Sequence, residues 1–294
     1  MFGLVRKILL ILFFWGLIFL FLFNQQKSFE YEKEVLGTLC RLQIKTSSAK
    51  AEKISQEVFL LWKDIQDKTN ILDPKSEISI LNSKKTLRVS ERLYELISTG
   101  YVMAEKTNGY LDMTIGTLTA ELFSGKKLSD AEIRNHLTKV NYRKINMDSK
   151  TKTVWITDAA LKIDVWGFSK GYAADETIKI LKKYGVTEAL IDLGGQMTVL
   201  GKERKVSLED PSNPGHIWKE VILKDGQTLA TSNQVWQKNH LFVPGLKKRK
   251  ENYISVSVIA SQGIIADSLD TAIFVAGDES INTLTQNVQI FVKK

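Results

Sequence analysis

The sequence predicts a mixed α+β domain that follows a short apolar N-terminal segment. Segments with apolar residues at helical spacing alternate along the chain with short segments typical of strands. Hydrophobic residues make up 44% and charged residues 25% of the 294 residues, an ordinary globular composition that excludes wholesale disorder. No internal repeat or low-complexity linker interrupts residues 29–294. We therefore expect a single mixed domain over that range.

The N-terminal segment, residues 1–28, predicts a membrane anchor. Residues 8–23 are an unbroken apolar run, preceded by Arg6 and Lys7. The run is slightly short for a spanning helix, but flanking residues and snorkelling of the basic pair extend it. It ends without the small-residue pattern of a cleavage site, although a cleaved signal remains the alternative. The basic pair places its own end in the cytoplasm, so we expect a single-pass membrane protein with the domain outside.

The first half of the domain begins with elements that the sequence predicts from periodicity. Residues 35–45 alternate in their second half and predict a strand. Residues 51–68 carry apolar side chains at helical spacing and predict an amphipathic helix. Ser90 suits the N-cap of a second helix, which should end at Asn108 and Gly109.

Further along, Ser129 predicts the start of a third helix, with Ile133 and Leu137 facing inward. Two short strands are expected after it, at residues 143–146 and 153–157.

The middle of the chain predicts a strand–helix–strand unit. Residues 160–166 are apolar and extended, residues 169–184 are helical, and residues 187–193 again resemble a strand. Such a unit is expected to be parallel, with a right-handed crossover. Beyond it we expect a hairpin near residues 224–226. The prediction ends with a strand at residues 253–260, a helix at residues 265–275 and a closing strand at residues 287–292.

Composition excludes several classes of site. The single cysteine, Cys40, cannot form an internal disulfide or a cysteine-cluster zinc site. Three scattered histidines are too few for a histidine-based metal centre. The net charge of +8 is partly local to residues 246–250, which indicate a solvated loop or a contact with anionic lipid or another polyanion. These lysines lack interleaved aromatic residues, so nucleic acid is not an expected partner.

Three clusters carry candidate chemistry. In the first, residues 107–116, two glycines, an acid and two threonines interrupt an apolar run, which describes either a ligand-binding loop or an ordinary loop. In the second, Gly167 precedes a helix whose first turn contains Lys170. Free backbone amides, the helix dipole and that lysine favour an anionic, phosphate-bearing ligand. Gly194 and Gly195 allow a second backbone segment to approach closely.

The third cluster is an acidic stretch inside an apolar helix. Asp267 and Thr271 are four residues apart and share a face, and Asp270 lies one residue aside. Acids in the first turn of a helix can serve as caps. Two carboxylates and a hydroxyl also form a hard-oxygen ligand set suited to Mg²⁺. The residues alone leave cap and metal site open.

Together these clusters resemble the ApbE-type FAD:protein FMN transferases. The resemblance runs from residues 36–38 to about Gly277. It is carried by the order and spacing of five segments: residues 76–82, 108–116, 167–175, 192–195 and 266–272. It implies the ApbE-like fold, with mixed sheets flanked by helices, and Mg²⁺-dependent transfer of FMN from FAD to a threonine of an extracytoplasmic protein, with release of AMP.

The resemblance also implies roles for particular residues. Lys170 would act with His240, the candidate general base. Mg²⁺ would be held by Asp267, Asp270, Thr271 and the backbone carbonyl of Gly167. Contacts to the FAD substrate would come from Leu36, Leu72, Tyr110, Leu111, Asp112, Asp164, Lys170 and Leu241.

Three departures from the family pattern concern the acceptor side. Val243 stands where the family has an acid, Gln196 replaces an acid or amide, and Asn233 occupies a usual glycine position. Two alternatives therefore stay open: a Mg²⁺-dependent FAD pyrophosphatase, and a non-catalytic flavin-binding or assembly protein.

Overall fold

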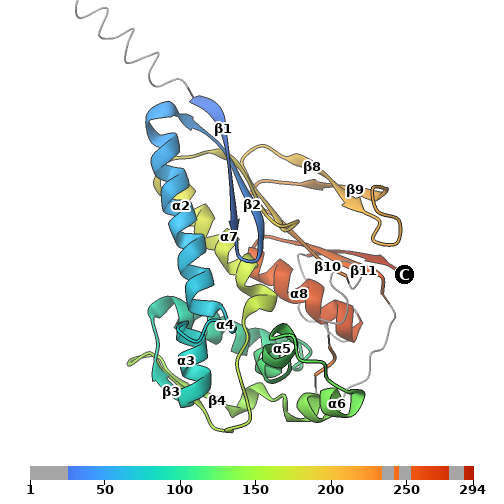
Figure 1. The fold of residues 1–294 in the computed structure, drawn as a ribbon. Coiled ribbons are helices and arrows are strands. Elements are labelled where there is room, and N and C mark those ends of the chain that lie inside the picture. The colour runs from blue at the N-terminus through green and yellow to red at the C-terminus, as the bar shows by residue number, and fades with distance from the viewer. Residues whose placement is uncertain (1–25, 234–241, 245–252, 278–287) are drawn as a thin grey trace, which may run out of the picture.

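The computed structural model describes residues 26–233, 242–244, 253–277 and 288–294 (Figure 1). It confirms a mixed α+β fold. Within these residues, seven strands form one sheet in the order β1-β2-β6-β7-β10-β11-β12, and every pair is antiparallel. The strands are β1 (Gln26–Val35), β2 (Thr38–Ser47), β6 (Glu188–Leu193), β7 (Met197–Leu200), β10 (Thr228–Asn233), β11 (Ser255–Ala260) and β12 (Gln289–Lys293).

The two faces of this sheet pack against different layers. Helices α2 (Ser48–Thr69), α7 (Trp166–Lys183) and α8 (Gly263–Ala276) cover one face. Strands β8 (Arg204–Glu209) and β9 (Ile217–Leu223) form a two-stranded sheet over the other. Alternate side chains of β11 point to the two layers. Val256 and Val258 face the main core, whereas Ile259 belongs to a second apolar cluster with β8 and β9.

A smaller, mostly helical part lies below the sheet in Figure 1. It begins after α2 and ends before α7. Its β3, β5 and β4 form a three-stranded antiparallel sheet in that order. Its elements are α3 (Glu77–Lys84), β3 (Thr86–Arg88), α4 (Glu91–Lys106), the 3₁₀ turn Met113–Ile115, α5 (Gly116–Phe123), α6 (Asp130–Lys139), the 3₁₀ turn Tyr142–Lys144, β4 (Ile145–Asp148) and β5 (Thr153–Ile156).

The predicted helices are confirmed, with small shifts at their ends. Ser90 caps α4 through a bond from the N–H of Leu93, and Ser129 forms a full capping box with Glu132. However, α7 begins at Trp166 rather than at residue 169. The apolar side chains of α6 turn inward only in part: Ile133 and Leu137 are half-buried on a mostly exposed helix, and no residue of α6 is fully buried.

The predicted strand over residues 35–45 is in fact a hairpin. Strand β1 ends at Val35 and β2 begins at Thr38, and the two pair along their whole length. Leu36 and Gly37 form the turn, with φ of 56° and 71°. Two successive positive φ values are the signature of a type I′ turn, whose twist matches that of the strands.

The predicted parallel strand–helix–strand unit is wrong. Residues 161–165 have no regular secondary structure and pair with no strand, and β6 pairs antiparallel with β2 and β7. The backbone of Ile163 instead bonds the side chain of Asn82: its N–H donates to Oδ1 at 2.6 Å, and its carbonyl accepts from Nδ2 at 2.8 Å. A buried amide thus replaces a neighbouring strand.

The expected hairpin near residues 224–226 is also corrected. A tight turn is present, in which the N–H of Gln227 donates to the carbonyl of Lys224. The strands on either side do not pair with each other, because β9 pairs with β8 while β10 pairs with β7 and β11. The turn therefore carries the chain from one sheet to the other.

The predicted anchor, residues 1–28, lies outside the described residues up to position 25. In the part of the chain that the structure covers, no helix is long and apolar enough to cross a membrane.

The amide of Asn82 generates a stability prediction. Asn82→Ala should lower the free energy of unfolding by about 2–4 kcal/mol, because it leaves a buried N–H and a buried carbonyl without partners. Thermal and urea unfolding measure this loss. Asn135→Ala on the exposed side of α6 is the control and should change stability by less than about 0.5 kcal/mol. A loss as small as the control's would contradict the role given to Asn82.

Candidate functional site

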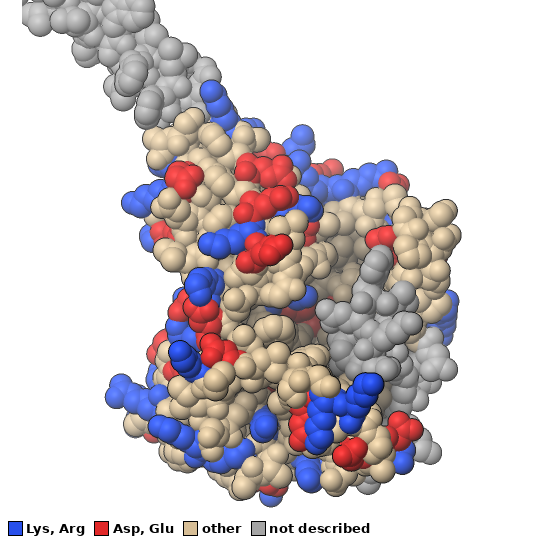
Figure 2. Space-filling view, in the orientation of Figure 1, with Lys and Arg blue, Asp and Glu red and all other residues tan. Residues whose placement is uncertain are grey.

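A cavity of about 410 Å³ lies between the sheet and the helical part. Figure 2 shows the surface hollowed between these two parts. The β1–β2 turn, the start of α7, the middle of α8, the end of β10 and residues 110–123 all contribute to its walls. The three sequence clusters therefore meet at one place. The lining includes these predicted site residues: Leu36, Tyr110, Leu111, Asp112, Asp164, Gly167, Lys170, Asp267, Asp270 and Thr271.

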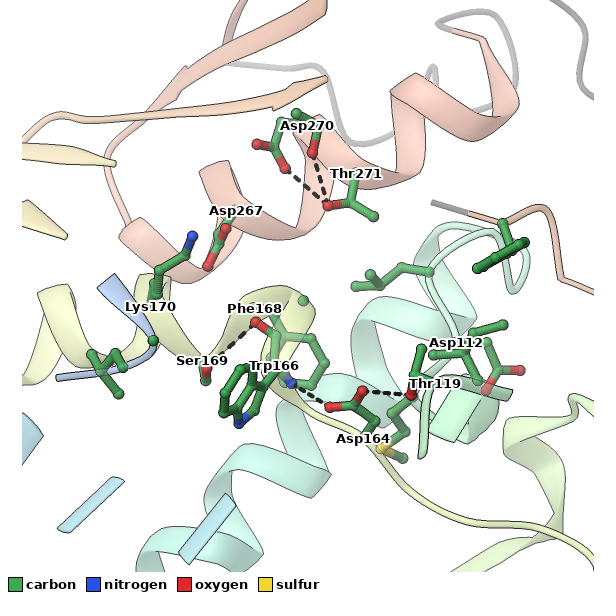
Figure 3. Close-up of a pocket in the computed structure, with 18 of the residues that line it drawn as sticks. Asp112, Thr119, Asp164, Trp166, Phe168, Ser169, Lys170, Asp267, Asp270 and Thr271 are labelled. Atoms are coloured by element: carbon green, nitrogen blue, oxygen red, sulfur yellow. Dashed lines mark hydrogen bonds between the residues drawn. The ribbon is translucent and has the colours of Figure 1, made fainter. Parts of the chain in front are cut away.

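The start of α7 gives the cavity its positive end. Figure 3 shows Lys170 directed toward Asp267. Lys170 makes no hydrogen bond or ion pair within the described residues. A Cβ built on Gly167 would meet nothing within 4 Å, so this first turn is open. The N–H groups of Trp166 and Phe168 are already bonded, to Asp164 and to the carbonyl of Val165. The positive end of the helix dipole and a cation one turn further along suit a diphosphate.

Opposite α7, helix α8 presents two buried carboxylates. Asp267 accepts a bond from the N–H of Gly171 at 2.8 Å. Burial raises the pKa of Asp267 to about 6, while Lys170 and the Gly171 N–H act against it. Burial and the charge of Asp267 hold the pKa of Asp270 well above its usual value. Two adjacent buried carboxylates of like charge call for a cation between them.

The residues around these carboxylates fit Mg²⁺. Thr271 donates to Asp270 at 3.2 Å, and its hydroxyl lies 3.1 Å from that of Ser232 on β10. In a regular helix the N–H of Gly171 also lies next to the carbonyl of Gly167, which brings that oxygen near Asp267. No group of three or more His, Cys, Asp or Glu side chains converges in the described chain. Two carboxylates completed by neutral oxygens suit a cation that keeps several waters.

Asp164 is held by the floor of the cavity. One carboxylate oxygen accepts from the N–H of Trp166 at 2.9 Å, and the other from the hydroxyl of Thr119 at 2.7 Å (Figure 3). Burial raises the pKa of Asp164, against those two bonds. The backbone beside it is fixed as well, because a Cβ on Gly116 would lie 2.6 Å from the carbonyl oxygen of Lys162. Asp164 therefore joins the starts of α5 and α7.

Asp112 holds its own loop. One oxygen accepts from the N–H and the hydroxyl of Thr114, at 2.9 and 2.7 Å, and the other accepts from the N–H of Tyr142 at 2.9 Å. Both oxygens thus have protein donors. The carboxylate lines the cavity, but its geometry fixes the loop that presents Tyr110 and Leu111.

Several apolar residues that line the cavity were not predicted from the sequence. Trp166, Ile115 and Phe123 line the cavity together with Phe242, and Gly37 leaves room for the indole of Trp166, whose nearest ring atom would lie 3.5 Å from an added Cβ. Trp166 stands within a motif already singled out, so its position was available from the sequence. Ser232 had no local signal, since its contact with Thr271 depends on the fold.

One predicted site residue lies away from the cavity, and two others fall outside the described residues. Leu72 is 48% exposed and does not line it. His240 and Leu241 lie outside the described residues. Of the departures, Asn233 lines the cavity, Val243 packs against the main core, and Gln196 is buried with no hydrogen-bond partner for its side-chain amide in the described chain.

Known proteins are similar to this chain in sequence and in fold. The chain matches the ApbE family over residues 36–292. It is 25% identical over 281 residues to the FAD:protein FMN transferase of Treponema pallidum (strain Nichols), across 83% of this chain and 78% of the relative. It is 23% identical over 274 residues to the FAD:protein FMN transferase of Klebsiella pneumoniae (strain 342), across 87% and 85%.

A solved structure shows the same fold. The crystal structure of the ApbE protein from Thermotoga maritima has a TM-score of 0.80 to this chain at 24% identity, and covers 90% of this chain and 94% of its own. The family match spans most of the sequence, including every cluster that lines the cavity. The chain therefore belongs to the ApbE family.

Proposed function

We propose that this protein is an FAD:protein FMN transferase, which moves FMN from FAD to a threonine of an acceptor protein and releases AMP. One observation carries the proposal: the open N-terminus of α7 with Lys170 faces the carboxylates of Asp267 and Asp270 across a single cavity that apolar and aromatic side chains also line. This arrangement suits a flavin joined to a diphosphate. The named activity of the curated relatives supports the same reading.

The cavity offers separate places for the two parts of FAD. Leu36, Tyr110, Leu111 and Trp166 line the cavity, and a flat ring system would displace water from their surfaces. The first turn of α7 and Lys170 would receive the diphosphate through backbone N–H groups and a charge-assisted bond.

Asp267, Asp270, Thr271 and the carbonyl of Gly167 would hold Mg²⁺. When bound, Mg²⁺ would neutralise the diphosphate and favour departure of AMP. The protein's own contribution is to fix this oxygen set before substrate arrives, which the bond from Gly171 to Asp267 does.

Transfer requires one bond to form and one to break. The hydroxyl oxygen of the acceptor threonine would bond to the phosphorus of the FMN half, and the P–O bond to AMP would break. We assign the acceptor's proton to His240, and Lys170 would stabilise charge on the departing phosphate. In this chain Ser232 and Asn233 line the side of the cavity near Thr271, where the acceptor would enter.

We further propose that the segment before β1, residues 1–25, anchors the protein in the membrane, with the domain and its acceptor outside the cytoplasm; residues 26–28 of the predicted anchor belong to β1. The apolar run and the basic pair before it support this placement. The departures at Val243, Gln196 and Asn233 favour keeping two alternatives for the test: hydrolysis of FAD without transfer, and flavin binding without catalysis.

The deciding experiment mixes the full chain with FAD, Mg²⁺ and a protein that carries a flavinylation threonine. Transfer should give covalent flavin fluorescence on the acceptor after denaturing electrophoresis, with one AMP per label. AMP without label would establish the pyrophosphatase alternative. Bound FAD with neither product would establish the non-catalytic one.

Removing one of the proposed metal carboxylates should weaken cation binding. Asp267→Asn should weaken Mg²⁺ binding by at least about 10–100-fold, since one charged ligand is lost, and should lower turnover correspondingly. Titration calorimetry and AMP release measure the two effects. Asp130→Asn, an exposed acid of α6, is the control. Unchanged Mg²⁺ affinity in Asp267→Asn would refute the metal assignment.

Removing the cation of α7 should affect substrate and turnover together. Lys170→Met should weaken FAD binding about tenfold, because one charge-assisted bond to the diphosphate is lost, and should slow transfer further. Equilibrium dialysis and initial rates measure these changes. Lys162→Met removes an exposed lysine of the preceding segment and should leave both values unaltered. Wild-type FAD affinity in Lys170→Met would place the diphosphate elsewhere.

The proposed base should act on rate rather than on binding. His240→Ala should slow transfer by about 10²–10⁴-fold, the usual effect of a general base, with FAD affinity changed less than about threefold. Single-turnover labelling and FAD titration separate the two. His216→Ala is the matched control. Full activity in His240→Ala would remove this histidine from the mechanism.

A further inference from the structure

Asp175 joins α7 to α8 although it does not line the cavity. Gln262, at the N-cap position of α8, makes no side-chain cap bond. Instead the carboxylate of Asp175 accepts from the N–H of Gly263 at 2.6 Å and from the N–H of Ile264 at 3.0 Å. The first turn of α8 is therefore capped from another helix, by a residue 88 positions earlier in the chain.

Next to this cap the two helices touch backbone to backbone. A Cβ on Gly171 would lie 2.4 Å from the carbonyl oxygen of Gly263, and a Cβ on Gly263 would lie 2.5 Å from that of Gly171. Both distances are shorter than any side chain allows. The pair of glycines is thus required for the crossing, and the crossing leaves little freedom for α8 to slide along α7.

A second interhelical bond lies one turn away. Gly171 stands four residues before Asp175 on α7, and Gly263 stands four residues before Asp267 on α8. The N–H of Gly171 donates to Asp267 at 2.8 Å, while Asp175 accepts from the start of α8. Two successive turns of each helix are therefore joined in antiparallel order, about 5.4 Å apart along the axis.

From these contacts we propose that Asp175 is a positioning residue for the cation site: by capping α8 against α7, it sets where Asp267 and Asp270 stand relative to Lys170. The proposal rests on the proposed function only in taking those aspartates as cation ligands. A carboxylate suits this place because each of its two oxygens accepts from a different backbone N–H, whereas an asparagine would turn its own NH₂ donor toward one of them.

Burying the charged carboxylate of Asp175 would be a costly way merely to cap the N-terminus of α8. Burial raises the pKa of Asp175 despite its two N–H donors; Lys179 acts to lower it and Glu176 to raise it. Asp175 also adds to the negative potential at Asp267, beside Lys170 and Asp270. An uncharged N-cap side chain at position 262 would stabilise α8 without burying a charge. The carboxylate on α7 is therefore better explained by the position along α7 at which it fixes α8.

The test compares cation binding with stability in the full chain. Asp175→Asn should weaken binding of Mn²⁺, followed by electron paramagnetic resonance, by about tenfold at a temperature where the variant is fully folded. FAD affinity without metal should stay within about twofold, because Lys170 and the first turn of α7 are unchanged. Glu176→Gln removes the neighbouring acid, which makes no bond to α8, and should match the wild type in both measurements.

A second variant covers the case in which Asp175→Asn does not fold. Gln262→Ser supplies a local N-cap, whose hydroxyl can accept from the first turn of α8. In the double variant with Asp175→Asn, helix stability should return while Mn²⁺ affinity stays about tenfold low. Recovery of wild-type affinity in the double variant would show that Asp175 serves stability alone and would overturn the proposal.

The outcomes also separate this inference from the proposed function. If the wild-type protein binds Mn²⁺ and both Asp175 variants bind it weakly, the positioning role stands even if no FMN transfer is detected. If the wild type does not bind Mn²⁺, the cation site fails and the positioning role fails with it.

Discussion

The crossing of α7 and α8 is the constraint on which the rest of the site depends. At Gly171 and Gly263 the helix backbones are in direct contact, so the positive first turn of one helix and the buried acids of the other face a common space. Neither helix could create that space alone. The N-terminus of α7 favours anions and the acids of α8 favour a cation, so under the proposed function a diphosphate with a divalent ion would satisfy both.

The remainder of the fold holds this pair of helices between two layers. Strands β10 and β11 support α8, and α2 supports α7. The helical part closes the cavity from below through short, buried polar links rather than through a sheet, namely Asn82 to Ile163 and Asp164 to Thr119. The first link fixes the backbone at Ile163, and the second fixes the carboxylate of Asp164, which lines the cavity, so hydrogen bonds with strict geometry hold this part of the wall.

How far the sequence predicts this structure depends on whether a residue's role is local. Helices with apolar periodicity and serine caps were predicted because cap and stripe lie within one segment. Strand β1 was missed, since most of its side chains are exposed and its pairing with β2 is what makes it a strand. Residues 160–166 were predicted to join a parallel sheet. Their apolar character indicates that they are buried, but it does not indicate that their partner is the side chain of Asn82 and not a strand. At the site, Lys170, Asp267 and Asp270 were predicted by residue type and family resemblance, whereas Ser232 contributes only through tertiary proximity.

The β1–β2 hairpin bears on how an acceptor reaches the site. Its turn, at Leu36 and Gly37, forms part of the cavity wall, and its opposite end starts at Gln26, directly after the N-terminal region. Ten paired residues extend about 33 Å. With residues 8–23 in a bilayer, this rigid ribbon would hold the cavity at roughly the height of one small domain above the lipid surface. Threonines displayed on a stalk or a projecting domain of a neighbouring membrane protein could be modified there, while those close to the headgroups would lie out of reach.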